Sequence, residues 1–226
     1  MVDKNAFDII GDYYVRPAGP DFAPGSICDA TVYYLPPGPL DVLKFDFDAA
    51  NRGEPVQYKI AAVDDITFNH RPVFGPRPLE HDEAFVVTRA KRRPVVILSS
   101  ATVHPTIAGL PRQDFAEVYL VTPPLYSFRD NHPLEFRLRI AAWEYSMWFH
   151  LPGSEGFEVR EGFLRLDRCL VIPRGQLRPR PVALTQNALF ALHHSLWWFL
   201  TGELHATLAD YRRYLLEALE ETLKQP

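Results

Sequence analysis

The sequence predicts an α+β protein in which C-terminal helices pack on a barrel or curled sheet of about five to seven short strands. Three observations favour this class. Prolines, 21 of 226 residues, gather at 17–39, 72–78, 105–133 and 173–181, where they interrupt the chain between short strands. Short alternating or apolar runs before residue 173 are typical of strands. After residue 184, apolar residues recur at three- and four-residue steps, which is typical of helices.

The N-terminal part is the least regular. We expect an irregular arm at residues 1–24 and a first strand at about 27–35, which stops at the sequence PPGP. Residues 41–66 contain two runs that could both be short strands. The rest of the segment 36–84 is expected to be a loop-rich insertion.

Strands are more clearly marked from residue 84 onward. We expect them within the ranges 84–100, 115–127, 134–143 and 162–172. The first of these ranges holds two apolar runs separated by a basic turn, Arg89 to Arg93. In 134–143, Phe136, Leu138 and Ile140 alternate with arginines, which predicts one apolar and one charged face.

Two helices are predicted at the C-terminal end. Thr185 is the expected N-cap of the first, which runs through QNALFALHHSLWWFL, and Gly202 is expected to end it. The second is expected at about 203–223, where leucines such as Leu208 and Leu215 form one stripe.

Composition excludes several classes of protein. With 47% hydrophobic residues the chain is globular, and a net charge of −4 gives no overall sign of nucleic-acid binding. The two cysteines lie far apart, and the start of the chain lacks the apolar core of a signal peptide. No run of 18 apolar residues is present, so we expect a cytoplasmic protein without a membrane span. Because no histidine has metal-site spacing and no phosphate loop or nucleophile elbow occurs, we expect no metal and no other cofactor.

Once metal ligands and nucleophile motifs are excluded, arginine is the residue type that could form a functional site. Its planar fork suits phosphate, and the cluster consists of Arg160, Arg165, Arg168, Arg174, Arg178 and Arg180, with Lys91, Arg92 and Arg93 upstream. Arg165 and Asp167 stand two apart in 162–172, so a strand would place both on one face. A surface ion pair of this kind contributes only about 0–1 kcal/mol. The arginines could therefore also be a solvated rim around a barrel.

Four segments in a fixed order resemble the PemK/MazF family of bacterial toxins. They are KRRPVVILSS, the strand ending LVTPPLYS, LRLDRCLVIPRGQL and ALTQNALFALHHSLWWFLTG, and they span about half of the chain, 88–202. The resemblance implies an SH3-like β-barrel with long loop insertions and C-terminal helices, usually a homodimer. Residues 85–226 would hold this barrel and both helices. Residues 1–84 would supply the arm, the first strand and the insertion, within one compact domain overall.

The resemblance also implies a metal-independent endoribonuclease that cleaves single-stranded mRNA and is inhibited by an antitoxin protein. Arg165 and Asp167 match the catalytic Arg-x-Asp pair of some members, and Arg93 matches another active-site arginine. Tyr126 or Ser127 falls near the family's threonine or serine after the middle strand and is expected to bind substrate by orienting the phosphate. The further basic residues expected to bind substrate are Arg92, Arg168, which stands where glutamine is usual, and Arg174.

These residue types suit cleavage of RNA by its own 2′-hydroxyl. The reaction needs a base for the 2′ proton, an acid for the leaving 5′-oxygen and positive charge around the phosphorane. Asp167 is the expected base, Arg165 the stabilising group and possible proton donor, and Arg93 the group that grips the phosphate. Aromatic residues of WEYSMWFH, 143–150, could stack on unpaired bases, or could equally belong to the core and a dimer interface.

Two alternatives stay open. The same barrel could be a non-catalytic binding protein that inhibits another protein, such as gyrase, through the helix aromatics Trp197 and Trp198. It could also be an accessory domain whose arginines only solvate it. Cleavage of RNA by the purified protein would separate the enzyme from both.

Overall fold

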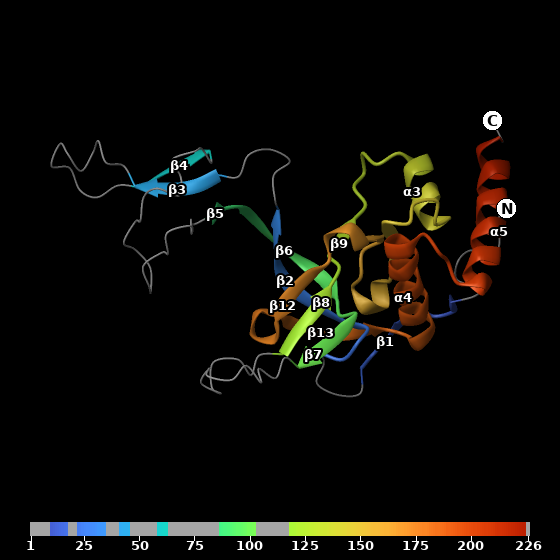
Figure 1. Cartoon of the computed structure of the whole chain (residues 1–226). Helices are drawn as coiled ribbons and strands as arrows, with labels where there is room; N and C mark the ends of the chain where they lie inside the picture. The colour runs from blue at the N-terminus through green and yellow to red at the C-terminus, as the bar shows by residue number, and fades with distance from the viewer. Residues whose placement is uncertain are drawn as a thin grey trace. The chain divides into compact units, whose positions relative to one another are not determined.

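The structure is a computed structural model that describes residues 10–17, 22–34, 41–45, 58–62, 86–102 and 118–224 (Figure 1). The chain divides into two compact units, one formed by Met1–Thr31 with Arg92–Pro226 and the other by Val32–Lys91. Most of the predicted arm and insertion, including residues 1–9 and 63–85, lies outside the described residues.

The described residues form a mixed α+β structure, which confirms the predicted class. The helices are α3 (Leu134–Ala141), α4 (Gln186–Thr201) and α5 (Ala206–Leu223). The strands pair in antiparallel ladders, and none of the described sheets closes on itself.

Three sheets belong wholly or mainly to the first unit. Their strand orders are β1 (Tyr14–Val15), β13 (Arg178–Leu184), β2 (Ser26–Tyr34), β6 (Arg89–Val96); β12 (Leu170–Pro173), β8 (Val118–Thr122), β7 (Ser99–Thr102); and β10 (Trp148–Leu151), β11 (Gly162–Arg165), β9 (Leu125–Ser127). In the second unit, both runs that could be strands within 41–66 are strands. They are β3 (Asp41–Phe45) and β4 (Tyr58–Ala62), and β3 also pairs with β5 (Val86–Val87).

Backbone hydrogen bonds continue the ladders from one sheet of the first unit to the next. Ile97 donates to Ser26 O at 2.9 Å, and Leu98 donates to Val121 O at 2.9 Å. Arg165 in turn donates to Pro124 O at 3.0 Å, where β8 passes into β9. The strands of this unit therefore follow one another as one hydrogen-bonded series.

The predicted strand at 134–143 is wrong, because this segment forms the helix α3. Pro133 stands at the N-cap position, and Arg139 hydrogen-bonds Glu135 one turn earlier at 2.9 Å. Ile140 is fully buried, and it lies four residues after Phe136, which is about one helical turn. A short alternation of apolar and charged residues fits either structure, and here the helical i, i+4 pairing prevails.

Both predicted C-terminal helices are confirmed, and the two residues predicted to cap the first of them do so. Thr185 Oγ1 accepts a hydrogen bond from Ala188 N at 3.3 Å, as an N-cap does. Gly202 ends α4 in the left-handed region, at φ 80°.

The sheet formed by β10, β11 and β9 has two different faces. One face belongs to the main core, where Phe149, Leu151 and Leu164 are fully buried. The opposite face carries the alternate residues, and α3 covers part of it through Phe136, whose ring contacts Trp148 at 5.5 Å. This second face positions the candidate site.

Candidate functional site: arginines and aromatic rings on one sheet face

In the sheet formed by β10, β11 and β9, the strand register places five side chains on the face opposite the main core. Trp148 lies opposite Arg165, and His150 lies opposite Phe163, in the ladder between β10 and β11. Tyr126 of β9 lies opposite Phe163, with ring centroids 5.9 Å apart in a stacked arrangement. Aromatic rings thus surround the arginine at the end of β11.

Arg165 and Asp167 form a bidentate ion pair. Arg165 Nε donates to Asp167 Oδ1 at 2.7 Å, and the second guanidinium nitrogen, Nη2, donates to Oδ2. The two side chains keep 22% and 24% of their surface exposed, so the pair is half-buried yet accessible. Such a fork-to-fork pair fixes the orientation of both groups.

The backbone that brings the pair together differs from the predicted strand. Arg165 is the last residue of β11, but Asp167 lies in a 3-10 turn, η3 (Leu166–Arg168), before β12 begins at Leu170. The prediction of one continuous strand over 162–172 is therefore wrong at its centre. Leu166 is buried, with 2% exposed, and anchors the turn, so the side chains on either side of it are free to meet.

The ion pair shifts the pKa of both partners. Partial burial disfavours ionisation of Asp167, but the hydrogen bonds and charge of Arg165 outweigh it and hold the Asp167 pKa below its usual value. The nearby charge of Arg168 acts in the same direction. The hydrogen bonds to Asp167 raise the pKa of Arg165. Near neutral pH the site therefore holds a fixed anion and a fixed cation.

Arg93 reaches the same place from β6. Its guanidinium carbon lies 4.1 Å from the centroid of the Tyr126 ring, and that of Arg165 lies 5.8 Å from the same centroid. The bridge between Val95 and Pro124 joins the end of β6 to the start of β9. The structure thus gathers Arg93, Tyr126, Arg165 and the carboxylate beside it, which come from segments far apart in the sequence.

Trp148 completes this group, which we call the arginine–aromatic cluster: Arg93, Tyr126, Trp148, Arg165 and Asp167. The guanidinium carbon of Arg165 is 6.0 Å from the Trp148 ring centroid. The sequence indicates aromatic stacking somewhere in 143–150 without selecting a residue. The alternation in WFHL, 148–151, is the signal that could select one, because it places Trp148 and His150 on one strand face.

The other residues predicted to bind substrate lie outside the cluster, although Arg168 directly follows Asp167. Strand alternation turns Ser127 away from Tyr126 and Arg92 away from Arg93, and Arg92 lies 3.6 Å from Asp29. Arg174 lies over the Phe22 ring at 4.6 Å. Arg168 is half-buried in the 3-10 turn beside Asp167.

A buried histidine paired with a partly exposed carboxylate occupies the far end of the same sheet face. His150 Nε2 and Glu161 Oε1 are 3.1 Å apart, and His150 is only 6% exposed. Phe128 stacks on the His150 ring, and the guanidinium of Arg137 lies 5.5 Å from the Phe128 ring centroid. Because aromatic side chains enclose His150, we assign this pair a structural role.

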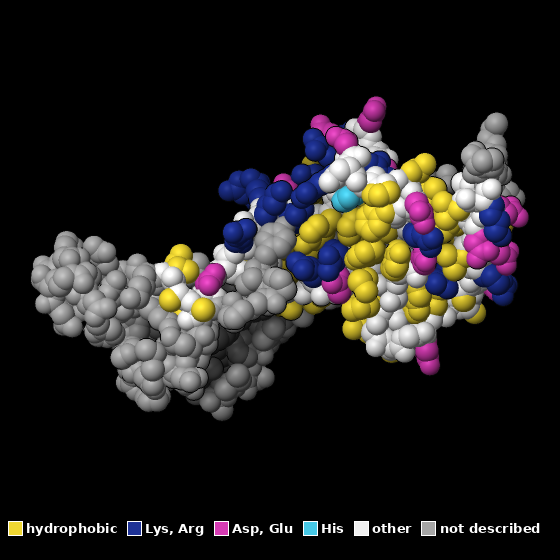
Figure 2. Space-filling model, turned by 90° about the horizontal axis from the view of Figure 1, so that it is seen from above, with side chains coloured by type: hydrophobic (Ala, Val, Ile, Leu, Met, Phe, Trp, Pro, Cys, Tyr) yellow, Lys and Arg dark blue, Asp and Glu magenta, His cyan; other side chains and the backbone are white. Residues whose placement is uncertain are grey.

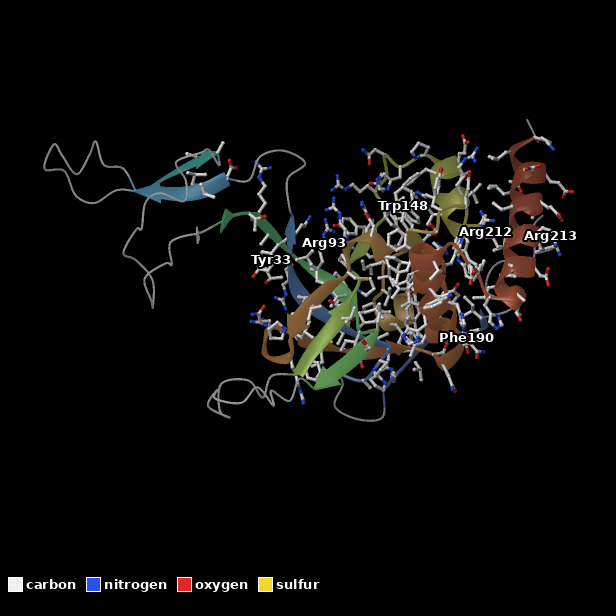
Figure 3. The ribbon with its side chains drawn as sticks, in the orientation of Figure 1. Tyr33, Arg93, Trp148, Phe190, Arg212 and Arg213 are labelled. Carbon is white, nitrogen blue, oxygen red and sulfur yellow. The ribbon has the colours of Figure 1, made fainter. Side chains whose placement is uncertain are left out.

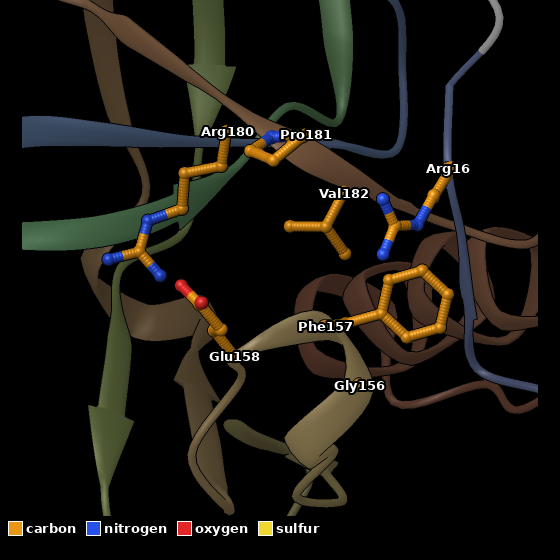
Figure 4. Close-up of a pocket in the computed structure, with 7 residues that line it drawn as sticks. All are labelled: Arg16, Gly156, Phe157, Glu158, Arg180, Pro181 and Val182. Atoms are coloured by element: carbon orange, nitrogen blue, oxygen red, sulfur yellow. The ribbon is translucent and has the colours of Figure 1, made fainter.

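A separate pocket of about 380 Å³ lies between β13 and the 3-10 turn η2 (Glu155–Phe157). Figure 4 shows Arg16 and Arg180 on opposite sides of it, with Val182 between them and Phe157 below Arg16. Its lining shares no residue with the arginine–aromatic cluster. Arg180 is already paired with Asp29 at 3.1 Å.

Basic and hydrophobic side chains lie next to each other on one face (Figure 2), a combination that can bind an anion with flat or apolar parts. Figure 2 shows Lys and Arg side chains gathered beside an area of hydrophobic side chains. In the part of the chain that the structure describes, no group of three or more His, Cys, Asp or Glu residues is placed to hold a metal ion. Two guanidinium groups and one carboxylate beside aromatic rings can bind a phosphodiester, stabilise added charge on it and move a proton.

Comparisons with known proteins leave this geometry as the main guide to function. No family model matches the sequence, and no curated protein and no solved structure matches the chain. None of the described helices combines the length and apolar composition that crossing a bilayer requires.

Proposed function

We propose that this protein is a metal-independent endoribonuclease of the PemK/MazF type, which cleaves single-stranded RNA in the cytoplasm and is inhibited by an antitoxin protein. The convergence of Arg93, Arg165 and Asp167 around the Tyr126 ring carries the proposal. The amino-acid sequence alone singles out these three residues, through the resemblance to that family. A random set of surface arginines would not be expected to meet at one ring.

An SH3-like barrel is the finer fold that we propose. Its support is the continuous series of strands in the first unit, in which hydrogen bonds from Ile97, Leu98 and Arg165 link one sheet to the next. The resemblance of the sequence to the same family is the basis for proposing a homodimer.

In the proposed reaction the ribose 2′-oxygen attacks the adjacent phosphorus and the bond from phosphorus to the 5′-oxygen breaks. The products are a 2′,3′-cyclic phosphate and a 5′-hydroxyl end. Asp167 accepts the 2′ proton, because each of its oxygens keeps a further lone pair while it accepts from Arg165. Arg93 and Arg165 stabilise the charge that develops on the phosphorane oxygens.

Protonation of the leaving oxygen is assigned to water. Hydrogen bonding to Asp167 raises the pKa of Arg165, which makes this arginine a poor proton donor. A water molecule donates to the 5′-oxygen and recovers its proton from Asp167, so the site returns to its starting state. The Tyr126 hydroxyl is buried, so its ring serves as a platform that holds the two guanidinium groups.

Purified protein incubated with a mixed-sequence RNA in EDTA tests the proposal. We expect cuts at a short preferred sequence, with cyclic-phosphate and 5′-hydroxyl ends, and none where the ribose before the cut is replaced by 2′-deoxyribose. Asp167→Asn, Arg165→Lys and Arg93→Lys should each slow cleavage by about 10²-fold or more, as loss of a proton-transfer or charge-stabilising group does.

An exposed ion pair on α5 supplies matched controls. Asp210 and Arg213 lie 2.8 Å apart with 71% and 70% of their side chains exposed. Asp210→Asn and Arg213→Lys make the same chemical changes away from the cluster and should leave cleavage unchanged. Absence of cleavage by the wild type, or equal cleavage by Asp167→Asn, would overturn the proposal.

A non-catalytic binding protein is the second candidate, and one observation favours it. Along α4, Phe190, Trp197 and Leu200 are 46%, 55% and 66% exposed, whereas Trp198 is half-buried beneath Arg212. This candidate predicts no RNA cleavage and a bound protein that Trp197→Ala releases. Retention of such a partner by Trp197→Ala would count against it.

A further inference from the structure

Arg212 joins α5 to the turn between α3 and β10. Its Nε donates to Trp143 O at 2.7 Å, and its Nη2 donates to Glu144 O at 3.3 Å. Its guanidinium carbon also lies 4.9 Å from the centroid of the Trp198 ring on α4. Figure 3 shows Arg212 on the side of α5 that faces α4 and the neighbouring Arg213 on the other side. One side chain therefore links α5, α4 and the turn.

The turn that Arg212 holds has an unfavourable backbone conformation. Trp143 has φ 54°, in the left-handed region that bulky side chains rarely adopt, and it is only 2% exposed. Such a conformation persists only where surrounding contacts hold it. Here Trp143 N donates to Ile140 O at 3.0 Å, while Arg212 satisfies the carbonyl groups on the other side.

The same turn leads directly into the arginine–aromatic cluster. Tyr145 packs on Trp148, with ring centroids 5.0 Å apart. Met147 O accepts a hydrogen bond at 2.9 Å from Leu166 N, which lies between the two residues of the ion pair. Trp148 is then the cross-strand partner of Arg165.

We propose that Arg212 is a positioning residue, which holds the turn 142–147 so that Trp148 stays against Arg165. The effect on RNA cleavage rests on the proposed function, whereas the effect on Trp148 does not. Removing the donors frees the carbonyl groups of Trp143 and Glu144, and the strained turn then has no contact with α5 through this side chain. Trp148 loses its fixed place beside Arg165, and the cluster loses its geometry.

The test compares Arg212→Met with Arg213→Met in full-length protein labelled with 5-fluorotryptophan. Methionine keeps an apolar stem against Trp198 but removes every donor. The chain has four tryptophans, so the ¹⁹F signal of Trp148 is assigned by its loss in Trp148→Phe. We expect Arg212→Met to shift or broaden this signal and to lower the cleavage rate at saturating RNA at least tenfold with little change in KM. Arg213→Met should resemble the wild type in both measurements.

Arg212→Lys extends the test. The lysine ammonium group restores one donor, so the Trp148 signal and the cleavage rate of Arg212→Lys should lie between those of Arg212→Met and the wild type. If Arg212→Met does not fold, the comparison moves to Arg212→Lys against Arg213→Lys, where only the first should displace the Trp148 signal. An unchanged Trp148 signal in a folded Arg212 variant overturns the inference. A displaced signal in a protein that cuts no RNA supports the positioning role and rejects the proposed function.

Discussion

The guanidinium carbon of Arg93 lies 4.1 Å from the centroid of the Tyr126 ring, although the two residues come from different strands, β6 and β9. Arg165 approaches the same ring at 5.8 Å and is held by Asp167. The Tyr126 ring thus contacts two guanidinium groups that come from different strands.

This relationship predicts different results for two substitutions of Tyr126. Tyr126→Phe should leave RNA cleavage within about twofold of the wild type, because the hydroxyl is buried and the ring remains. Tyr126→Leu removes the ring face and should slow cleavage by about 5- to 30-fold, which corresponds to the usual strength of a partly desolvated cation–π contact. Steady-state cleavage of a fluorescent RNA measures both. Equal activity of the Leu and Phe variants would exclude the ring from this role.

Gly162 is predicted to be intolerant of any side chain. A Cβ at this position would lie 2.3 Å from Tyr126 O and 2.8 Å from Ser127 Cα, so β9 would have to move away from β11. Gly162→Ala should therefore lower the free energy of unfolding by about 1–3 kcal/mol, as overpacking does. Gly175→Ala is the matched control, because nothing lies within 4 Å of a Cβ there. Urea denaturation of the two variants would refute the prediction if their midpoints agreed.

The ion pair predicts a pH dependence of stability. Arg165 lowers the pKa of Asp167 against the opposing effect of burial, so the native state binds a proton less readily than the unfolded chain. The resulting stabilisation is complete above the unfolded value of about 3.9 and is lost as pH falls through the lower native pKa. The difference in unfolding free energy between wild type and Asp167→Asn should therefore shrink below about pH 4.

Urea unfolding between pH 2 and pH 7 measures this difference. Asp210→Asn, which removes a carboxylate that is 71% exposed, is the control. A difference in unfolding free energy between wild type and Asp167→Asn that stays constant from pH 2 to pH 7 would contradict the predicted lowering of the Asp167 pKa.

Thr185 is predicted to stabilise the start of α4 through its hydroxyl group. Its Oγ1 accepts from Ala188 N at 3.3 Å and donates to Asp12 O at 2.6 Å, which ties the helix to the chain before β1. Thr185→Ala should cost about 1 kcal/mol, or about 2–4 °C in Tm for a chain of this size. Thr185→Ser keeps the oxygen and should retain most of the stability in the same thermal scan. Equal losses in both variants would show that the hydroxyl does not cap the helix.

Local signals in the sequence predicted several elements correctly. Thr185 and Gly202 marked the ends of α4, because capping depends on residues within one turn of the helix. The strand after Gly25 was also predicted, since its apolar residues follow one another within a few positions. The segment of α3 was misjudged, because Phe136, Leu138 and Ile140 satisfy a strand pattern that a helix also accommodates over so short a length.

The sequence by itself determined the α+β class, the two C-terminal helices and the choice of Arg93, Arg165 and Asp167 as candidate residues. The tertiary structure decided how they meet. A 3-10 turn, not a continuous strand, brings Asp167 to Arg165. Pairing between β9 and β11 brings Tyr126 to them, and the bridge between Val95 and Pro124 brings Arg93 from β6. The roles of Trp148 and Arg212 could not be predicted, because their partners are remote in sequence and only strand register and helix packing place them together. Residue type limits which chemistry is available, whereas long-range contacts decide which residues share a site.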